Sequence, residues 1–533
     1  MSMKFVVSGQ LYPPIIGNLA QKLPINRKFY SDSACNQLLM GKNPPSRLQE
    51  ILFATSNKAE SRQITALLKR NLICKIAPRI YTSNFLDEPN VIINRNWYRI
   101  LAHLYPDAIV SHRSALEYRP TPGGHIFLTY SYTENVNLPG LTIHFLKGPG
   151  KGDGDNSFFE NLHVSQEARA FLENLQDSRK TTESKSLPIA EIEERLESIV
   201  RARGGKGLNE LLDKAKQLAR KLSMEKEFKR LNEVIGGLLG NGESRNLKSP
   251  TAIARALGDP VDPDRIRLFE SLYEELAGKV FPDYKEKRKG NAYKTFAFFE
   301  SYFSNYIEGI EFTVGEAREI ITTGKPIPSR HEDSQDILGT YRIVSDRKEM
   351  SVCPTSPDHF LDLIRKRHAI LLQSRISKKP GEFKNRNNAV GSVEFVDRQL
   401  VNGTLKKGFE WYTLLRDPFA KAIYMMFLVS EVHPFNDGNG RIARVMMNAE
   451  LSAKGLTKII IPTVYRDNYM GALRKLTRQR VADAYLRMLL RAYEFSSALV
   501  SEGIDDMETH LIKCDALKEP NEGKLRIMET NNR

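Results

Sequence analysis

The feature that most constrains this chain is the segment His-Pro-Phe-Asn-Asp-Gly-Asn-Gly-Arg-Ile-Ala-Arg at residues 433–444. Apolar residues at helical spacing predict a helix over residues 420–432. Because Pro434 disfavours helical backbone in the residue before it, this helix should end at His433. A turn with two glycines follows, and residues 441–450 again show one apolar face. The sequence therefore predicts two helices joined by a glycine-rich turn, which delivers backbone N–H groups to the start of the second helix.

This arrangement has the chemistry of a phosphate site. Backbone N–H groups at a helix start bind anions, since hydrogen bonding and the helix dipole both favour phosphate there. Arg441 and Arg444 share a helix face and can clamp further phosphate oxygens. Asp437 is a candidate Mg²⁺ ligand beside this cradle, and His433 is a candidate general base at its mouth. The combination favours transfer of a nucleotidyl or phosphoryl group to a hydroxyl.

The segment resembles the complete motif of the Fic family, His-Pro-Phe-x-Asp/Glu-Gly-Asn-Gly-Arg-x-x-Arg. The resemblance implies an all-α Fic core over residues 291–500 that transfers AMP from ATP to a Ser, Thr or Tyr hydroxyl of a target protein. It makes His433 the catalytic base and Asp437 the Mg²⁺ ligand. It assigns the binding of the ATP phosphates to five residues: Gly438, Asn439, Gly440, Arg441 and Arg444. Doc-type kinases have Lys at the position of Gly440. The glycine in this chain therefore disfavours a simple phosphorylation reaction.

Two further segments resemble parts of the same family. Residues 380–384, Pro-Gly-Glu-Phe-Lys, resemble the start of the flap, a hairpin that docks the acceptor segment as an added strand. We expect the flap at about residues 391–401, where main-chain hydrogen bonds would hold an extended target. An ordinary surface hairpin is the alternative. Tyr465 and Tyr469 resemble residues beside the adenine pocket, but their i,i+4 spacing fits core packing equally well.

A second motif indicates a built-in switch. An aromatic-rich helix is predicted near residues 298–310, in which Ser304 and Glu308 share a face. With Gly309 they match the Fic inhibitory motif, Ser/Thr-x-x-x-Glu-Gly/Asn. The resemblance implies that Glu308 pairs with Arg444, the guanidinium that should hold the γ-phosphate, so that the resting enzyme is weakly active. Some family members use the same glutamate to remove AMP, so the reverse reaction is also allowed. The alternative is a solvated glutamate on an exposed face.

The N-terminal region shows a different pattern. Residues 1–45 have no clear period and stay unassigned, whereas residues 46–92 are typical of a winged helix-turn-helix, with a first short helix over 47–55. Together with Ser-His-Arg-Ser-Ala-Leu at 111–116, this region resembles AbiEi-type antitoxins and regulators. The resemblance implies that helix 59–70 enters the major groove of DNA. The candidate DNA contacts are Arg62, Gln63, Lys69 and Arg79. A protein-docking module or a solvated basic face is the alternative.

The remaining segments complete the expected fold. Residues 93–185 are predicted to be an α+β extension with strands near 124–147, residues 186–290 a helical linker region, and residues 501–533 a polar tail. The expected fold class is therefore multidomain. An α+β winged helix-turn-helix region is followed by an all-α Fic-type catalytic core with a small β-hairpin flap.

Composition excludes several other classes. Of 533 residues, 41% are apolar and 27% charged, which is typical of globular proteins and excludes wholesale disorder. The longest apolar run, at 422–429, is far shorter than the roughly 20 residues of a membrane helix, and the N-terminus lacks a secretory h-region. The cysteines form no C-x-x-C pair, which disfavours a disulfide scaffold or zinc site. We expect a cytoplasmic protein with no membrane partner.

Charge leaves the partner open. The net charge of +15 favours a polyanion without identifying it. The leading hypothesis is a Mg²⁺- and ATP-dependent protein adenylyltransferase. The rival is a DNA-binding transcriptional regulator whose Fic domain senses nucleotide. A different nucleotide donor is a third hypothesis, because the cradle grips phosphates rather than the base. The sequence leaves a homo-oligomer open.

Overall fold

The computed structural model describes residues 48–55, 57–178, 183–240, 247–390 and 393–528. These divide into two compact units. One contains the described residues up to His103 together with Leu138–Leu141, and the other contains the rest. Among the described helices, none is both long and apolar enough to cross a membrane.

The first unit opens with a small antiparallel sheet. Its strands are β1 (Ile51–Phe53), β2 (Cys74–Ala77) and β3 (Ile80–Thr82), in the order β1-β3-β2. Helix α1 (Lys58–Lys69) lies between β1 and β2 in the sequence, and Asn57 caps it by accepting the Ala59 N–H at 2.9 Å. Helices α2 (Pro89–Arg95) and α3 (Trp97–Leu104) follow. The helix predicted over residues 59–70 is thus present as α1.

The short helix predicted over residues 47–55 is wrong, because Ile51–Phe53 form a strand that pairs with β3. A run of three apolar residues fits a strand as well as a helix, and periodicity cannot separate the two over so short a length. A strand therefore precedes α1 where a helix was expected. The winged helix-turn-helix and the AbiEi resemblance are not confirmed. The unassigned residues 1–45 lie outside the described residues.

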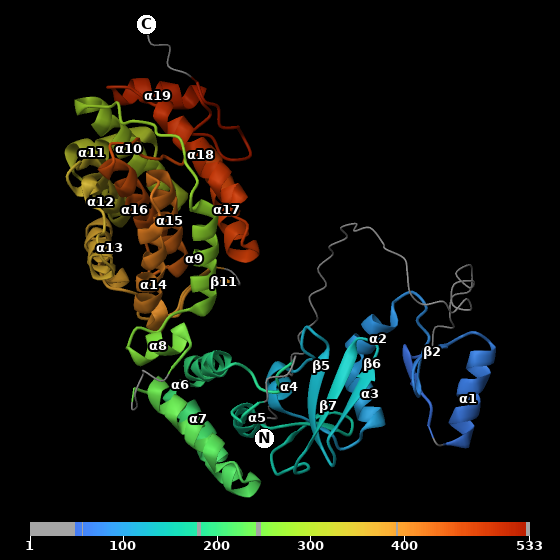
Figure 1. The fold of residues 1–533 in the computed structure, drawn as a ribbon. Coiled ribbons are helices and arrows are strands. Elements are labelled where there is room, and N and C mark those ends of the chain that lie inside the picture. Colours follow the sequence, from blue (N-terminus) through green and yellow to red (C-terminus); the bar gives the residue numbers. More distant parts are fainter. Residues whose placement is uncertain (1–47, 56, 179–182, 241–246, 391–392, 529–533) are drawn as a thin grey trace, which may run out of the picture. The chain divides into compact units, whose positions relative to one another are not determined.

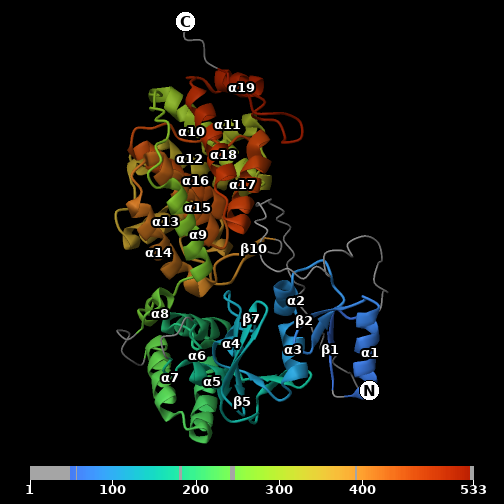
Figure 2. The ribbon, with the colours of Figure 1, turned by 45° about the vertical axis from the view of Figure 1, so that its right-hand side comes forward.

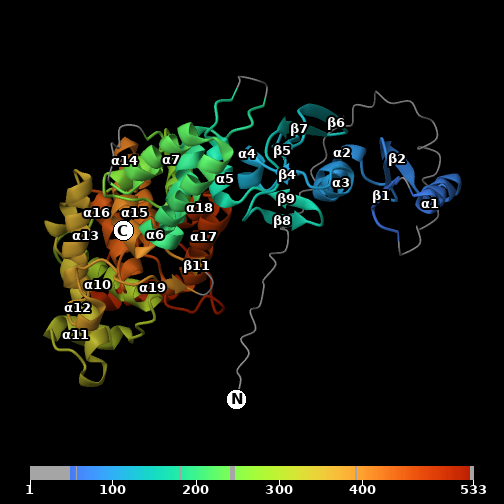
Figure 3. The same ribbon diagram turned by 90° about the horizontal axis from the view of Figure 1, so that it is seen from below.

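The second unit begins with a mixed sheet in the order β6-β7-β5-β4-β9-β8. Strands β5 and β7 pair in parallel, as do β4 and β9, whereas β4 pairs antiparallel with β5. Strands near 124–147 are confirmed. Helices α4 (His112–Glu117) and α5 (Glu167–Asn174) pack on each other, and α4 contacts β5 (Figure 3). The strands are β4 (Ile109–Val110), β5 (His125–Tyr130), β6 (Glu134–Leu138), β7 (Leu141–Lys147), β8 (Asn156–Phe159) and β9 (Leu162–Val164).

Three helices follow the sheet and share an apolar cluster with α5. They are α6 (Ile189–Leu222), α7 (Glu225–Leu238) and α8 (Pro250–Ala256). Helix α6 contains one non-helical residue, Gly204, at which it kinks. The helical character predicted for this region is confirmed.

The rest of the chain is a helical bundle with one small hairpin, as predicted (Figures 1 and 2). The hairpin is formed by β10 (Ala389–Val390) and β11 (Val393–Glu394). The helices are α9 (Pro263–Leu276), α10 (Gly290–Ile307), α11 (Val314–Thr323), α12 (His331–Ser345), α13 (Pro357–Leu371), α14 (Val401–Leu414), α15 (Pro418–Val432), α16 (Asn439–Ala453), α17 (Arg466–Gln479), α18 (Asp483–Ala498) and α19 (Ile504–Lys513).

Helices α15 and α16 form the centre of this bundle and pack side by side (Figure 1). Helix α15 is apolar on nearly all sides and buried along almost its whole length, as expected for a central helix. The surrounding core includes Leu268 of α9, and a neighbouring apolar cluster joins α10 to Met507 of α19. The bundle therefore extends beyond the predicted bounds of 291–500 on both sides.

Candidate active site

The site lies where α15 ends and α16 begins. His433 terminates α15 with a φ of 53° and a ψ of 59°, and Pro434 follows it, so the predicted helix end is confirmed. Gly438 is the N-cap of α16, and its φ of 72° lies in the left-handed region that glycine adopts without steric cost. A Cβ there would also crowd Leu372, at 3.0 Å. Helix α16 begins at Asn439, earlier than predicted.

Asn439 closes the loop between the two helices. Its side chain accepts the Phe435 N–H at 2.8 Å and donates to the Phe435 carbonyl at 2.9 Å, and it is buried. The side chain thereby holds the loop closed. The N-cap of α16 makes no side-chain cap hydrogen bond. The first-turn N–H groups therefore remain available to an anion.

His433 is held as a neutral base. Its ring stacks on Phe395, with 3.7 Å between centroids and 9° between planes, and Nδ1 lies 3.3 Å from the Ser430 carbonyl. Because a carbonyl only accepts, Nδ1 carries the proton and Nε2 keeps its lone pair. Burial lowers the pKa of His433 to about 4. The imidazole is therefore unprotonated near neutral pH.

Arg444 is fully engaged by the end of α10. Its guanidinium donates to the Ser304 hydroxyl at 3.0 Å, to the Ser304 carbonyl at 2.8 Å and to Glu308 at 2.8 Å. Burial is the largest single influence and lowers the pKa of Arg444, but the charges of Glu308 and Tyr469 and the hydrogen bonds to both together raise the pKa overall. The predicted contact between Glu308 and Arg444 is present. Gly309 follows Glu308 with a φ of 84°.

The Glu308 carboxylate also lies over the first turn of α16. A Cβ built on Gly440 would overlap Glu308 Oε1, so only glycine leaves room for the carboxylate there. The Glu308 side chain keeps 29% of its surface exposed, whereas that of Arg444 keeps 6%. The carboxylate thus occupies the accessible side of the cradle, where an anion would bind.

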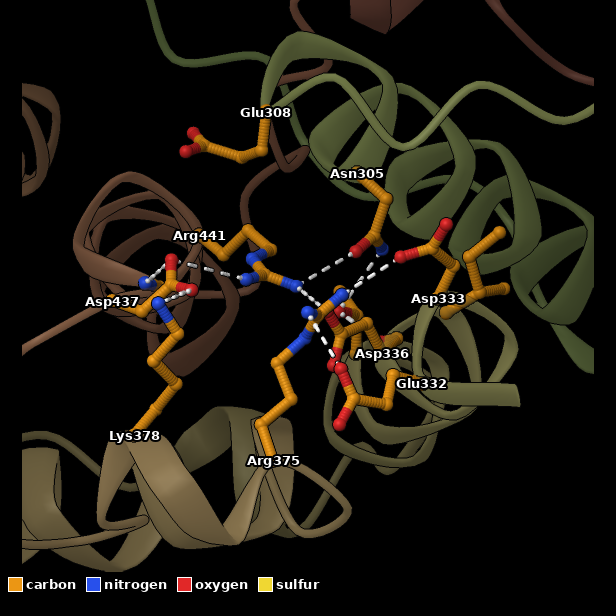
Figure 4. Close-up of polar contacts among 12 residues, drawn as sticks. Asn305, Glu308, Glu332, Asp333, Asp336, Arg375, Lys378, Asp437 and Arg441 are labelled. Carbon is orange, nitrogen blue, oxygen red and sulfur yellow. Dashed lines mark hydrogen bonds and ion pairs between the residues drawn. The ribbon is translucent and has the colours of Figure 1, made fainter. Parts of the chain in front are cut away.

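Arg441 is held by residues that sequence reasoning missed (Figure 4). Its guanidinium donates to Asp336 at 2.6 Å and to Asn305 at 3.3 Å. Asp336 is completely buried on α12 and also accepts from Arg375 at 2.7 Å. None of these partners lies near the motif in the sequence, so no local pattern could have identified them.

Asp437 fits a Mg²⁺ ion that takes most of its ligands from substrate phosphates and water. Its side chain is 34% exposed, one oxygen accepts the Gly438 N–H at 2.7 Å, and the other lies 3.6 Å from Lys378 Nζ (Figure 4). Within the described ranges, no group of three or more His, Cys, Asp or Glu side chains could hold a metal. Mg²⁺ commonly uses one or two carboxylates together with substrate phosphates and water. A single half-exposed carboxylate beside a phosphate cradle fits that pattern.

The hairpin predicted as the flap lies slightly earlier than expected, at β10 and β11. Of the predicted flap, 391–392 lie outside the described residues, and Arg398–Leu400 form a 3-10 turn rather than a strand. The hairpin is tied down at its base, where Arg265 donates to the Glu394 carbonyl at 2.9 Å. Lys384, in the segment before it, donates its backbone N–H to the Pro434 carbonyl at 2.8 Å. The hairpin is thus connected to the loop that carries the motif.

The two tyrosines occupy different environments. Tyr469 is buried, and its hydroxyl lies 3.5 Å from Arg444, so it packs under the guanidinium. Tyr465 is half-buried and lines an open hollow with Asn468 and Lys475 on α17. Core packing therefore describes Tyr469 well, and an adenine contact stays a prediction for both.

The candidate DNA contacts lie in the first unit. Arg62, Gln63 and Lys69 are exposed on α1. Arg79 is exposed in the turn between β2 and β3, with a φ of 65°. The four side chains are thus accessible, and DNA binding stays a prediction.

An uncapped helix start, two arginines and a neutral histidine thus lie together at one end of the helical bundle. Residues 358–451 match the model of the Fic/DOC family. The match covers α13 to most of α16, and it includes His433 and both arginines.

The chain is also similar to several curated proteins. It is 24% identical to protein adenylyltransferase fic-1 of Caenorhabditis elegans over 239 residues, which are 44% of this chain and 46% of that protein. It is 26% identical to protein adenylyltransferase Fic of Nematostella vectensis over 253 residues, 43% of this chain and 55% of that protein. The chain thus spans about half the length of these relatives.

Two further matches are a shorter relative and a solved structure. A probable protein adenylyltransferase of Aquifex aeolicus is 39% identical over 59 residues, 11% of this chain and 18% of that protein. Among solved structures, Fic-1 of C. elegans (residues 134–508) aligns with 61% of this chain and 98% of its own at 18% identity, with a TM-score of 0.34.

Proposed function

We propose that this chain is a protein adenylyltransferase that transfers AMP from ATP to a hydroxyl side chain of a target protein, and that Glu308 keeps it weakly active at rest. One observation carries the proposal. A neutral histidine and an arginine covered by a glutamate meet at the uncapped start of a helix, inside a Fic/DOC domain. The curated relatives are named adenylyltransferases, and the chain matches about half of each.

In the proposed reaction the acceptor hydroxyl loses its proton to His433 Nε2 as its oxygen attacks the α-phosphorus of ATP. The bond to the β-phosphate oxygen breaks, and pyrophosphate leaves. The first-turn N–H groups of α16 bind the phosphates, and Arg441 adds positive charge beside them. Asp437 would hold Mg²⁺ together with the phosphates, and the ion would neutralise part of their charge. The hairpin β10–β11 would dock the target segment by main-chain hydrogen bonding.

Glu308 opposes this reaction in two ways. Its carboxylate covers the first turn of α16, where its negative charge repels a phosphate. It also occupies the Arg444 guanidinium, which is then not free to align the γ-phosphate for in-line attack. Located at the mouth of the site, the same carboxylate can orient a water molecule for removal of AMP from a modified target.

The test uses α-labelled ATP with Mg²⁺, the full chain and a cell lysate. We expect little label with the wild type, strong label with Glu308→Gly and none with Glu308→Gly/His433→Ala. Glu311→Gly is the matched control, because Glu311 is an exposed glutamate just beyond the helix, and it should behave as the wild type. Absence of label with folded Glu308→Gly would contradict the proposal for ATP, and the other nucleoside triphosphates would then be tested as donors.

A second candidate function is DNA binding by the first unit, which Arg62, Gln63, Lys69 and Arg79 favour because all four are exposed. The test is binding of a labelled duplex measured as a function of salt concentration. If Arg62 and Lys69 each neutralise one phosphate, their replacement by alanine should lower the slope of log K against log salt by about 2. An unchanged slope would contradict the contact.

A further inference from the structure

A histidine outside the motif contacts the phosphate-binding loop. His368 lies on α13 and is fully buried. Its Nδ1 accepts the Gly381 N–H at 3.0 Å, and its Nε2 lies 3.0 Å from the Asp437 carbonyl. Because an N–H only donates and a carbonyl only accepts, one neutral tautomer, protonated at Nε2, satisfies both contacts.

The ring of His368 is also fixed through its face. It stacks on Phe435 with 3.7 Å between centroids and 4° between planes. A Cβ built on Gly438 would come within 3.5 Å of His368 Nε2. His368 therefore contacts the loop at Asp437 and Phe435, and its in-plane bonds and its ring stack together leave it a single orientation.

Through Gly381, His368 also contacts the segment that precedes the hairpin β10–β11. Gly381 has a φ of 80°, and a Cβ there would lie 3.1 Å from the Ala369 side chain and 3.2 Å from the Arg365 carbonyl. Only glycine allows the chain to pass this close to α13 in that conformation. The close approach brings the Gly381 N–H to His368, so α13 holds the segment before the hairpin and the phosphate loop with one side chain.

The contact with Asp437 reaches the candidate metal ligand itself. The Nε2–H of His368 fixes the Asp437 carbonyl, and the next peptide N–H, that of Gly438, donates to the Asp437 carboxylate at 2.7 Å. The orientation of this peptide group therefore sets the direction of the carboxylate. It also sets the start of α16, because Gly438 is the N-cap of that helix.

We propose that His368 is a positioning residue, which holds the Asp437–Gly438 peptide so that the carboxylate and the first-turn N–H groups of α16 face the same phosphate. The kinetic part of this proposal rests on the proposed adenylyltransferase function. The proposed ordering of the loop between α15 and α16 does not depend on that function.

Two substitutions in the Glu308→Gly background separate positioning from packing. In His368→Gln, the amide nitrogen can still reach the Asp437 carbonyl. In His368→Asn, the shorter amide keeps an acceptor for Gly381 but cannot reach Asp437. Both variants lose the stack on Phe435, so both should be destabilised to a similar extent. Only His368→Asn should raise KM for ATP, by about tenfold, while His368→Gln stays within about threefold. His359→Asn, on the same helix, is the control and should change neither.

Amide hydrogen exchange of residues 435–442 without nucleotide gives a readout that needs no activity. Exchange should be faster in His368→Asn than in His368→Gln. Equal exchange and equal KM in the two variants would overturn the proposal, because they would show that His368 acts through packing alone. If Glu308→Gly transfers no AMP but the exchange difference is found, the proposed function fails and the positioning role stands.

Discussion

At the scale of single residues, the two motif arginines differ in how permanently they are engaged. Arg441 pairs with Asp336, whose side chain is completely buried, whereas Arg444 pairs with Glu308, whose side chain is 29% exposed. A buried carboxylate between two arginines is a fixed part of the fold. A half-exposed glutamate at a helix end can be displaced at much lower cost. Regulation is therefore expected at Arg444 and not at Arg441.

Asp336→Asn should be strongly destabilising. The substitution leaves Arg441 and Arg375 without their shared negative charge inside the bundle, and breaking a buried pair of this kind typically lowers the free energy of unfolding by about 3–5 kcal/mol. Glu332→Gln is the matched control, because Glu332 also pairs with Arg375 but is 56% exposed. It should change stability by less than about 1 kcal/mol. Denaturant titration measures the free energy of unfolding of both variants. Equal effects would contradict a special structural role for Asp336.

The pH dependence of catalysis should follow His433. Because burial lowers its pKa to about 4, the base is neutral above that pH, and activity should rise with pH through an acidic limb near 4. The profile of kcat/KM for Glu308→Gly measures it, with the limb at or below that value, because the charge of Glu308 raises the pKa of His433 and this variant lacks it. Phe395→Ala removes the ring that shields one face of the imidazole. The pKa of His433, and with it the acidic limb of the variant's profile, should therefore move toward the ordinary histidine value of about 6.5. A limb unaffected by Phe395→Ala would contradict shielding by this ring.

At the scale of elements, helix α10, which ends beside Glu308, is part of the core. It contacts α16 through a series of polar pairs, spaced about one turn apart along α16. The pairs are Asn305 with Arg441, Ser304 with Arg444, and Glu300 with Asn448. Most of α10 is also buried. If Glu308 inhibits as proposed, we therefore expect activation to move the Glu308 side chain and to leave the helix in place.

Glu308→Gly should accordingly leave α10 in place. We expect unchanged amide exchange over Gly290–Ile307 and a change in unfolding free energy of about 1 kcal/mol, since only a partly exposed pair is lost. Hydrogen exchange of wild type and variant, compared without nucleotide, measures this. Faster exchange along the whole helix in the variant would show that Glu308 stabilises the packing of α10 in the bundle.

The sequence predicted those elements whose signals are local. Helix α15 and its end could be predicted because a long apolar pattern meets Pro434. The start of α16 was predicted two residues too late, because Asn439 and Gly440 were assigned to the turn. Strand β1 was mistaken for a helix because Ile51–Phe53 is too short to show a period. Asp336 and His368 could not be found at all. Their roles depend on which helices pack against α16, and no spacing within their own segments records that.

At the scale of the whole molecule, every residue of the candidate site comes from the helical bundle, and among the described residues the first unit contributes none. The two candidate activities, AMP transfer and DNA binding, are therefore assigned to residues of different units. Net charge does not link them, because the +15 belongs to the whole chain, whereas the phosphate cradle works through a few fixed groups.

Substitutions in one unit should therefore leave the activity of the other unchanged. Arg62→Ala/Lys69→Ala, in the Glu308→Gly background, should weaken binding to a duplex and keep AMP transfer to the chain itself within about twofold, because sites without shared partners behave additively. His433→Ala should abolish transfer and leave the DNA affinity and its salt dependence unchanged. Loss of transfer in the folded Arg62→Ala/Lys69→Ala variant would show that the first unit takes part in catalysis, for instance by presenting the acceptor.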